Sequence, residues 1–302
     1  MTILIIIYAL FVFLGSVMSK LCSNVTRGES RSAYALYFTV HSLVACIFFI
    51  VSSGGNPELN LPTIIYSLLL AATILINMLI SMLMLRYASI LGSGLLTSPF
   101  KIFLTSLVGV IMFNEALTST VLIRVAILTL SAALVYTDVR IQAKGATDGQ
   151  KRGGTDMRKF IPLAVISIIV STVQSVIPKH FAMSKEVTNE HSFFLMTNVI
   201  MLLFGLVLFS TELFKSPDAF KTSLVILKPK KILPTTLNVV VSNVSSLVMM
   251  PILAQVDLTV FTPMSAAYGV VVAVVASLCF REKLGVFSYL GAAVAMLAMI
   301  IQ

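Results

Sequence analysis

The stretches MFNEAL, at Met112 to Leu117, and CFREKL, at Cys279 to Leu284, decide the fold that this sequence predicts. Phe, Glu and Leu occupy the same positions in both, and the two glutamates, Glu115 and Glu282, are 167 residues apart. Each copy ends a long apolar run that carries a proline, and another apolar run follows at once. We therefore take 167 residues as the period of an internal repeat.

The composition predicts an integral membrane protein. With 58% hydrophobic and 11% charged residues over 302 positions, the chain has too little polar surface for a soluble globule. Its apolar runs repeatedly reach the ~18 to 20 residues that cross a bilayer. A net charge of +9 would suggest nucleic acid on a soluble surface, but in a membrane protein it indicates orientation. No nucleic-acid partner is therefore expected.

Ten apolar runs are each long enough for one membrane-spanning helix. Because they lack the alternation of barrel strands, we expect helices. The runs are Thr2 to Ser19, Ser32 to Pro57, Asn60 to Leu85, Tyr87 to Asn114, Ala116 to Thr137, Phe160 to Pro178, Ser192 to Thr211, Ile232 to Val256, Leu258 to Phe280 and Leu284 to Gln302. Prolines within them, Pro99, Pro251 and Pro263, mark expected kinks or breaks.

The polar, glycine-rich segment Arg140 to Lys159 divides the runs five and five. The predicted organisation is a first repeat over residues 1–139, a basic flexible linker over 140–159 and a second repeat over 160–302. An odd number of spans per repeat makes the second copy enter the membrane from the opposite side. Inverted repeats of this kind are the plan of many secondary transporters.

Basic residues indicate the orientation. With the N-terminus outside, the inner loops hold 17 Lys and Arg residues and the outer loops hold two, Lys179 and Lys185. This bias favours both termini outside. We expect a multi-pass protein of the plasma or inner membrane.

The chain resembles the drug/metabolite transporter superfamily, and within it the EamA type with two repeats. The resemblance rests on the ten spans, on LRYASI at Leu85 to Ile90, on SPF at Ser98 to Phe100, and on MFNEAL and CFREKL. It implies ten helices in two inverted five-helix repeats around a central cavity, and alternating access without ATP for small metabolites, often outward. It also implies cytoplasmic termini, whereas the basic residues favour the opposite orientation.

Lys101 stands near the middle of its run, where a lysine costs about 2.5 to 3.5 kcal/mol on insertion scales. We expect a cavity cation that meets an anionic group of the substrate; the alternative is a lysine satisfied by carbonyls or by snorkelling. Tyr268 is the counterpart of Lys101 at 167 residues, so a pseudo-twofold axis would bring both to one site. An aromatic packed in the core is the alternative for Tyr268.

Neutral polar side chains supply the other candidates. The resemblance places the spans that carry Asn77, Ser98, Gln174 and Asn243 around the cavity. The amides are the better candidates, because a full amide is hard to satisfy in a membrane without a partner; serines also serve as glue between helices. His41 is expected to be a satisfied interior histidine, with proton coupling as the alternative.

All 12 acidic residues fall in loops or at the ends of runs, so we expect no buried carboxylate. This disfavours organic cations as substrates. Glu115 and Glu282 are expected to cap the helices that directly follow them, and Lys179 to be an interface anchor.

The expected function is a secondary active transporter that exports an amino acid or another small carboxylate-bearing metabolite. Carriage of phosphorylated or nucleotide-linked sugars and multidrug efflux are the alternatives. No enzyme is expected, because paired intramembrane aspartates and an Asp-rich diphosphate motif are both lacking. No cofactor or metal is predicted. A coupling ion, with the proton as one candidate, is left open.

Overall fold

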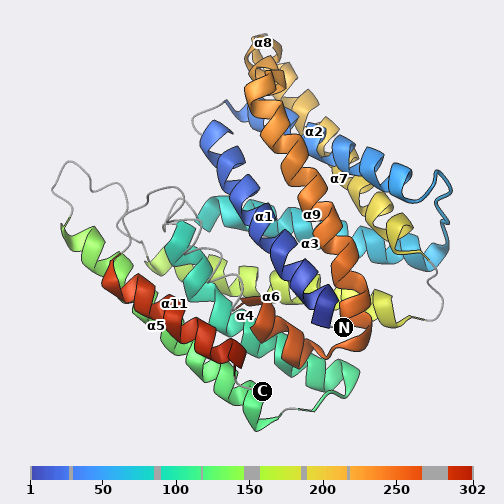
Figure 1. Cartoon of the computed structure of the whole chain (residues 1–302). Coiled ribbons are helices and arrows are strands. Elements are labelled where there is room, and N and C mark those ends of the chain that lie inside the picture. The colour runs from blue at the N-terminus through green and yellow to red at the C-terminus, as the bar shows by residue number, and fades with distance from the viewer. Residues whose placement is uncertain are drawn as a thin grey trace. The chain divides into compact units, whose positions relative to one another are not determined.

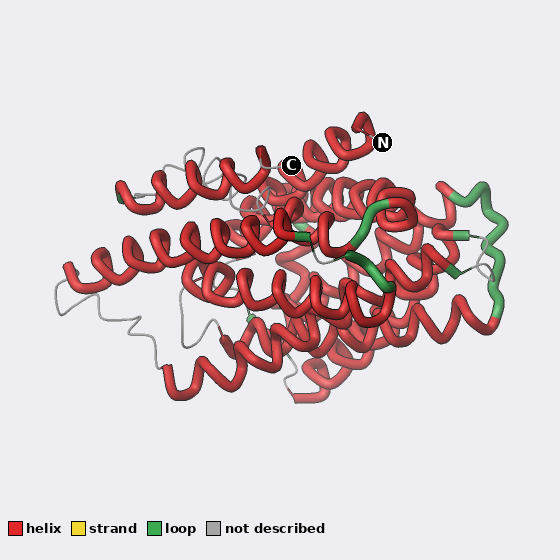
Figure 2. Tube along the Cα trace, turned by 90° about the horizontal axis from the view of Figure 1, so that it is seen from below, coloured by secondary structure: helices red, strands yellow, loops and turns green. Residues whose placement is uncertain are grey.

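The computed structural model describes residues 2–26, 30–84, 90–116, 118–145, 157–184, 189–215, 218–266 and 285–300. Throughout these ranges the regular structure is helical, joined by short loops and without a strand (Figure 2). The α-helices are α1 (Thr2–Thr26), α2 (Arg31–Ser52), α3 (Leu61–Met84), α4 (Ile90–Phe113), α5 (Ser119–Gly145), α6 (Met157–Met183), α7 (Glu190–Lys215), α8 (Ala219–Ser223), α9 (Pro229–Gln255) and α11 (Val286–Ile300). A 3-10 turn, η2 (Leu224–Leu227), follows α8, and residues 258–266 are also helical.

Six of the described helices contain a segment long and apolar enough to cross a membrane. These segments are Ser32–Ser52, Leu61–Ile80, Ser119–Asp138, Phe160–Met183, Glu190–Lys215 and Pro229–Gln255. Shorter apolar helical segments are Ile3–Gly15, Phe100–Phe113 and Val286–Ala298. The chain is thus an all-α protein with the helices of a membrane protein, and the full set of ten spans stays a prediction.

Part of the predicted linker is helical. α5 continues past the apolar run to Gly145, and α6 begins at Met157, whereas residues 146–156 are outside the described ranges. The extension is reasonable because Arg140, Gln142 and Lys144 are good helix formers. Polarity therefore marks where a helix leaves the membrane rather than where the helix ends.

Prolines do not end the helices in which they stand. α6 passes through Pro162 and Pro178, and α9 passes through Pro234 and Pro251. α9 is not broken at Pro251, since it runs on to Gln255, and a kink there stays a prediction. Neighbouring helices can satisfy the carbonyl that a proline frees inside a membrane.

The chain forms two compact units. Unit 1 comprises Met1–Ala72 and His180–Ala254, and unit 2 comprises Thr73–Lys179 and Gln255–Gln302. Each unit takes helices from both halves of the sequence. The units are groups of helices that pack together, so they differ from the predicted sequence repeats, which stay a prediction.

In unit 1, α2 packs lengthwise against α7 (Figure 1). Gly205 of α7 allows this close approach, because a Cβ atom there would lie 2.9 Å from Oγ1 of Thr39. Further along, the ring of Phe49 on α2 stacks on Phe194 of α7 at 5.5 Å between centroids. A small residue at one level and paired aromatic rings at another fix the register of the two helices.

In unit 2, α5 packs lengthwise against α11 (Figure 1). Leu128 of α5 joins Ala295 and Ala298 of α11 in a buried cluster that also includes Ile102 of α4. A hydrogen bond 2.6 Å long runs from Oγ of Ser131 to the backbone oxygen of Gly291. Small side chains on α11 thus allow the close helix contact that membrane proteins favour.

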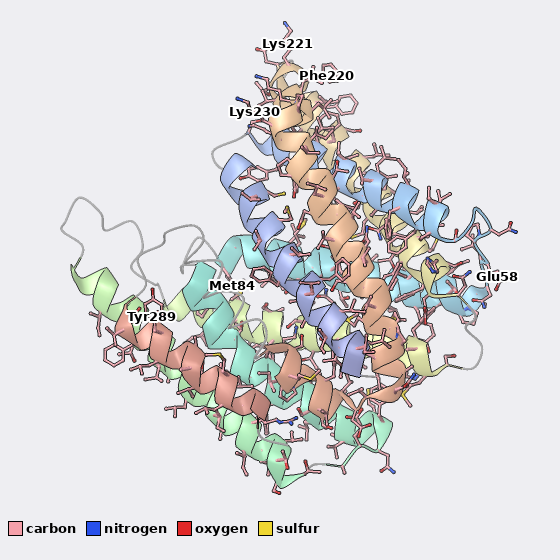
Figure 3. All side chains as sticks on the ribbon, in the orientation of Figure 1. Glu58, Met84, Phe220, Lys221, Lys230 and Tyr289 are labelled. Carbon is pink, nitrogen blue, oxygen red and sulfur yellow. The ribbon has the colours of Figure 1, made fainter. Side chains whose placement is uncertain are left out.

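The two ends of unit 1 differ in charge. Lys221 and Lys230 lie at the end formed by α8 and the start of α9, and Glu58 lies at the other end, in the loop between α2 and α3 (Figure 3). That loop, residues 53–60, contains no Lys or Arg. Phe220 is also exposed at the basic end, with 52% of its surface accessible. This asymmetry is expected of helices that cross a bilayer.

Candidate functional site

Asn77 links α3 to α6 inside unit 2. Its Nδ2 donates to Oε1 of Gln174 at 3.2 Å, and its Oδ1 accepts from Oγ of Ser167, also at 3.2 Å. All three side chains are half-buried. Two of the predicted amides are therefore brought together, and the Nε2 group of Gln174 makes no hydrogen bond with a described residue. It is a donor that a ligand could use.

Lys101 lies on the face of α4 that meets α6. Thr105, one turn after Lys101, donates from Oγ1 to Oγ1 of Thr172 on α6 at 3.4 Å. Residues four apart share a helix face, so Lys101 stands on that face too. The lysine is half-buried and has no ion-pair or hydrogen-bond partner among the described residues. Such a cation in the middle of a span needs a polar environment.

Contacts of α6 place Lys101 and Asn77 at one level. Two contacts join α4 to α6: Lys179 lies over the ring of Phe113, and Thr172 bonds to Thr105. In both contacts the residue of α6 is numbered 66 or 67 higher than its partner in α4, so the two helices run in the same direction. Lys101 then stands beside residue 167 or 168 of α6, which is the level of Ser167, the partner of Asn77. The cation and the amide pair of unit 2 are therefore less than about two helical turns apart along α6.

The buried polar contacts around Lys101 extend beyond the predicted residues. Thr105, Thr172 and Ser167 were not among the candidates from sequence. A signal for Thr105 was available, since a threonine four residues after a buried lysine lies on the same face. For Thr172 and Ser167 no signal was available, because their partners are on other helices.

The remaining predicted residues lie elsewhere. The side chain of Ser98 and all of Tyr268 are outside the described part of the chain, so the pairing of Tyr268 with Lys101 stays a prediction. Asn243 belongs to unit 1, where it is buried in α9. Its Nδ2 atom has no hydrogen-bond partner among the described residues.

Glu115 caps a helix other than the expected one. Its Oε1 accepts from the backbone N–H of Leu258 at 2.8 Å, and its Oε2 accepts from that of Thr259 at 2.9 Å. These amides open the helix over residues 258–266, whereas the helix directly after Glu115 is α5. The capping role holds, but the predicted target is wrong. A carboxylate at orphan N–H groups is favoured by the helix dipole. Glu282 lies outside the described residues.

Lys179 completes the same cluster. Its Nζ donates to the backbone oxygen of Val256 at 2.7 Å and lies 3.7 Å from Oε1 of Glu115. The lysine side chain is only 4% exposed, so the expected interface anchor is wrong. The charge of Lys179 is thus matched within the protein and is not offered to a substrate.

Two carboxylates of the described residues are buried, contrary to the expectation of none. Besides Glu115, Asp138 is 4% exposed and accepts through Oδ2 from the N–H of Gly285 and from the hydroxyl of Ser288. Both acids stand near span ends and are held by hydrogen bonds. Because of these bonds, neither offers the unpaired intramembrane carboxylate that cationic substrates would need.

The histidines near the loop between α2 and α3 are held by hydrogen bonds. Nδ1 of His180 is 2.6 Å from the hydroxyl of Tyr66, and Nδ1 of His191 is 2.8 Å from Oγ of Ser52. Among the described residues no group of three or more His, Cys, Asp or Glu side chains has the arrangement of a metal site.

Comparison with known proteins adds information on the fold. No protein-family model and no curated protein matches the sequence. One similar solved structure, described only as "Crystal structure of protein", has a TM-score of 0.62 and 17% sequence identity, with 99% of this chain and 96% of that chain covered. At this identity, the likeness shows a shared fold along nearly the whole chain.

Proposed function

We propose that the protein is a secondary transporter of a small polar metabolite that carries a carboxylate, such as an amino acid. One observation carries the proposal: Lys101, unpaired among the described residues, stands within about two helical turns of the Asn77–Gln174 amide pair along α6 in unit 2. An unpaired cation suits a carboxylate, which accepts charge-assisted hydrogen bonds, and Nε2 of Gln174 is a further donor in the same unit that is free among the described residues. Alternating access of two inverted five-helix repeats in the plasma or inner membrane, on the EamA-type plan, belongs to the same proposal.

The pairing of Lys179 within the protein favours carboxylate substrates over phosphorylated or nucleotide-linked sugars. Those substrates carry two or more negative charges and would need more than one cation. Lys179 is engaged by Glu115 and Val256, which leaves Lys101 as the one intramembrane lysine of unit 2 that is unpaired among the described residues. Multidrug efflux of cations is disfavoured because both buried carboxylates are held by hydrogen bonds.

Transport by purified protein in liposomes tests the proposal. Uptake of radiolabelled amino acids should be lost in Lys101→Ala and partly kept in Lys101→Arg, because arginine preserves the charge. Lys221→Ala is the matched control, since Lys221 is an exposed lysine at the basic end of unit 1. Equal transport by Lys101→Ala and the unmodified protein would remove Lys101 from the mechanism.

A thermal-shift screen separates the substrate classes. Amino acids and other small carboxylates should stabilise the protein in detergent by a free energy of RT ln(1 + [L]/Kd) and so raise its melting temperature, whereas sugar phosphates and quaternary amines should not. Stabilisation by a sugar phosphate alone would favour the alternative carrier class. Stabilisation by quaternary amines alone would favour drug efflux.

A further inference from the structure

A second polar cluster lies in unit 1, where α1, α2 and α9 meet. The side chain of Tyr37 on α2 interacts with Cys22 of α1 and with Thr235 and Asn238 of α9. The ring of His41, one turn further along α2, lies 6.2 Å from that of Tyr37 between centroids. Tyr37 therefore has Asn238 on one side and His41 on another.

Contacts along the helices indicate that His41 and Ser242 lie at a similar level of unit 1. α2 runs in the same direction as α9, because Ser32 at its start bonds to Thr222, just before α9, and Tyr37 meets Asn238 further on. His41 follows Tyr37 by four residues, which is a rise of about 6 Å along α2. Ser242 follows Asn238 by four residues, which is the same rise along α9. Since Tyr37 meets Asn238, His41 and Ser242 are at a similar level.

Gly15 of α1 packs against α9 at that level. A Cβ atom on Gly15 would lie 3.7 Å from Cγ1 of Val241 and 3.9 Å from Oγ of Ser242, which is ordinary contact. A glycine is not needed here for close packing, in contrast to Gly205. The missing side chain leaves α1 without bulk opposite Ser242.

Two side-chain atoms in this cluster are buried without a partner. Oδ1 of Asn238 and Nδ1 of His41 have no hydrogen-bond partner among the described residues. Asn238 is only 8% exposed, so bulk water does not reach it freely. A buried polar atom left unpaired is costly in any protein, and more so within a membrane. Oδ1 of Asn238 therefore calls for an external hydrogen-bond donor, and Nδ1 of His41 for an external partner.

The charges around the cluster define the donor. α1, α2 and α9 contain no Asp or Glu. A buried ammonium would therefore lack a counter-ion, and a buried carboxylate would face the unpaired Oδ1 of Asn238, which is an acceptor. An uncharged O–H or N–H group fits both constraints. Asn243 is five residues from Asn238, about 140° around the helix, and so belongs to another face of α9.

We propose that Tyr37, His41, Asn238 and Ser242 form a binding site for the uncharged hydroxyl or amide group of a small molecule. The site is in unit 1 and uses none of the residues around Lys101. It goes beyond the proposed transport function, and loss of either property leaves the other measurable.

Histidine nuclear magnetic resonance is a direct probe, because the chain has three histidines and the other two already have protein partners. The protein, labelled with ¹⁵N-histidine and held in lipid nanodiscs, is titrated with glycerol and, separately, with acetamide. The His41 Nδ1 resonance should shift saturably with at least one probe, while those of His180 and His191 stay fixed. Titration with acetate should leave His41 unchanged.

Substitutions at the acceptor identify the site. Asn238→Leu should weaken the response of His41 by about tenfold, which corresponds to one lost hydrogen bond. Asn198→Leu is the matched control, because the Asn198 amide bonds to the carbonyl of Phe194 in its own helix, and it should leave the response unchanged. If Asn238→Leu does not fold, Gly15→Val, which fills the space opposite Ser242, should weaken the response instead.

Two results would overturn the proposal. One is a His41 resonance that ignores both uncharged probes, as expected if the cluster holds ordered water only. The other is an equal response in the folded Asn238→Leu or Gly15→Val variant and in the unmodified protein.

Discussion

The Nζ atom of Lys179 lies 3.7 Å from Oε1 of Glu115, and the two side chains are only 4% and 3% exposed. The pair ties together two distant parts of unit 2, since Glu115 also accepts from the amides of Leu258 and Thr259. Removal of one partner from a buried pair leaves an uncompensated charge, which is far more costly than loss of an exposed pair.

Breaking this pair should destabilise the protein strongly. Lys179→Met is expected to cost about 3 to 5 kcal/mol, because the Glu115 carboxylate stays buried without its cation. The melting temperature in detergent is the measurement. Lys215→Met is the control, since the Lys215–Glu212 pair is exposed and its loss should have little effect. A fall of similar size in both variants would contradict the argument.

A matched double substitution separates the pair from its parts. The double variant Glu115→Gln with Lys179→Met removes both charges. The side-chain oxygen of the new glutamine can still accept from the backbone N–H of Leu258, at the start of the helix over residues 258–266. The double variant should melt above Lys179→Met alone, because no charge stays buried and unpaired. Additive losses in the double variant would show that the charges act independently.

Gly205 should be intolerant of any side chain. A Cβ atom there would lie 3.0 Å from Cδ1 of Phe38 and 3.2 Å from the Cα atom of Thr39, which is backbone and cannot move aside. Gly205→Ala should therefore lower the melting temperature by separating α2 from α7. Gly15→Ala is the control, since its Cβ has ordinary contact distances. Equal melting of both variants would show that the contact at Gly205 relaxes freely.

Asn77 and Gln174 should be coupled in a double-mutant cycle. Each single change to Leu leaves the other amide half-buried without its partner, whereas the double change removes both. The expected coupling is of the order of 0.6 kcal/mol, the average for hydrogen bonds between membrane helices. Thermal or denaturant unfolding in detergent measures it. Zero coupling would mean that the contact adds nothing to the packing of α3 on α6.

The basic end of unit 1 should face the cytoplasm. Single cysteines at Lys221 and at Glu58, both exposed, are introduced into a variant without native cysteines. In intact cells a membrane-impermeant maleimide should label Glu58→Cys and spare Lys221→Cys, because basic residues remain on the inner side. The reverse pattern would favour the cytoplasmic termini that the family resemblance implies.

The helices could be predicted closely from the sequence because continuous apolar runs of span length admit few other structures. The run from Asn60 to Leu85 became α3, Leu61–Met84, and the run from Ser192 to Thr211 lies inside α7, Glu190–Lys215. Helix ends at the water side were less predictable. Charged residues end a hydrophobic run, but they also have good helix propensity in water. α5 therefore continues to Gly145.

Partners of the polar residues could be predicted only in part. The sequence predicted that amide side chains within the spans would need partners, and Asn77 and Gln174 do form a hydrogen bond. The partners of Glu115 could not be predicted, because Leu258 is 143 residues away and its contact with Glu115 depends on how non-adjacent helices pack. The absence of buried carboxylates was inferred from position in the sequence, but Asp138 is buried by Gly285 and Ser288 of a much later segment.

Gly285 stands so close to Asp138 that a built Cβ atom would overlap the carboxylate. This contact has a consequence for biogenesis. Glu115 and Asp138 are synthesised in the first half of the chain, but their amide and hydroxyl donors arrive only with residues 258, 259, 285 and 288. Until those last segments leave the ribosome, neither carboxylate can make these hydrogen bonds. A chain that stops before residue 258 would keep its first helices and lack these donors, although Lys179 would still be present to pair with Glu115.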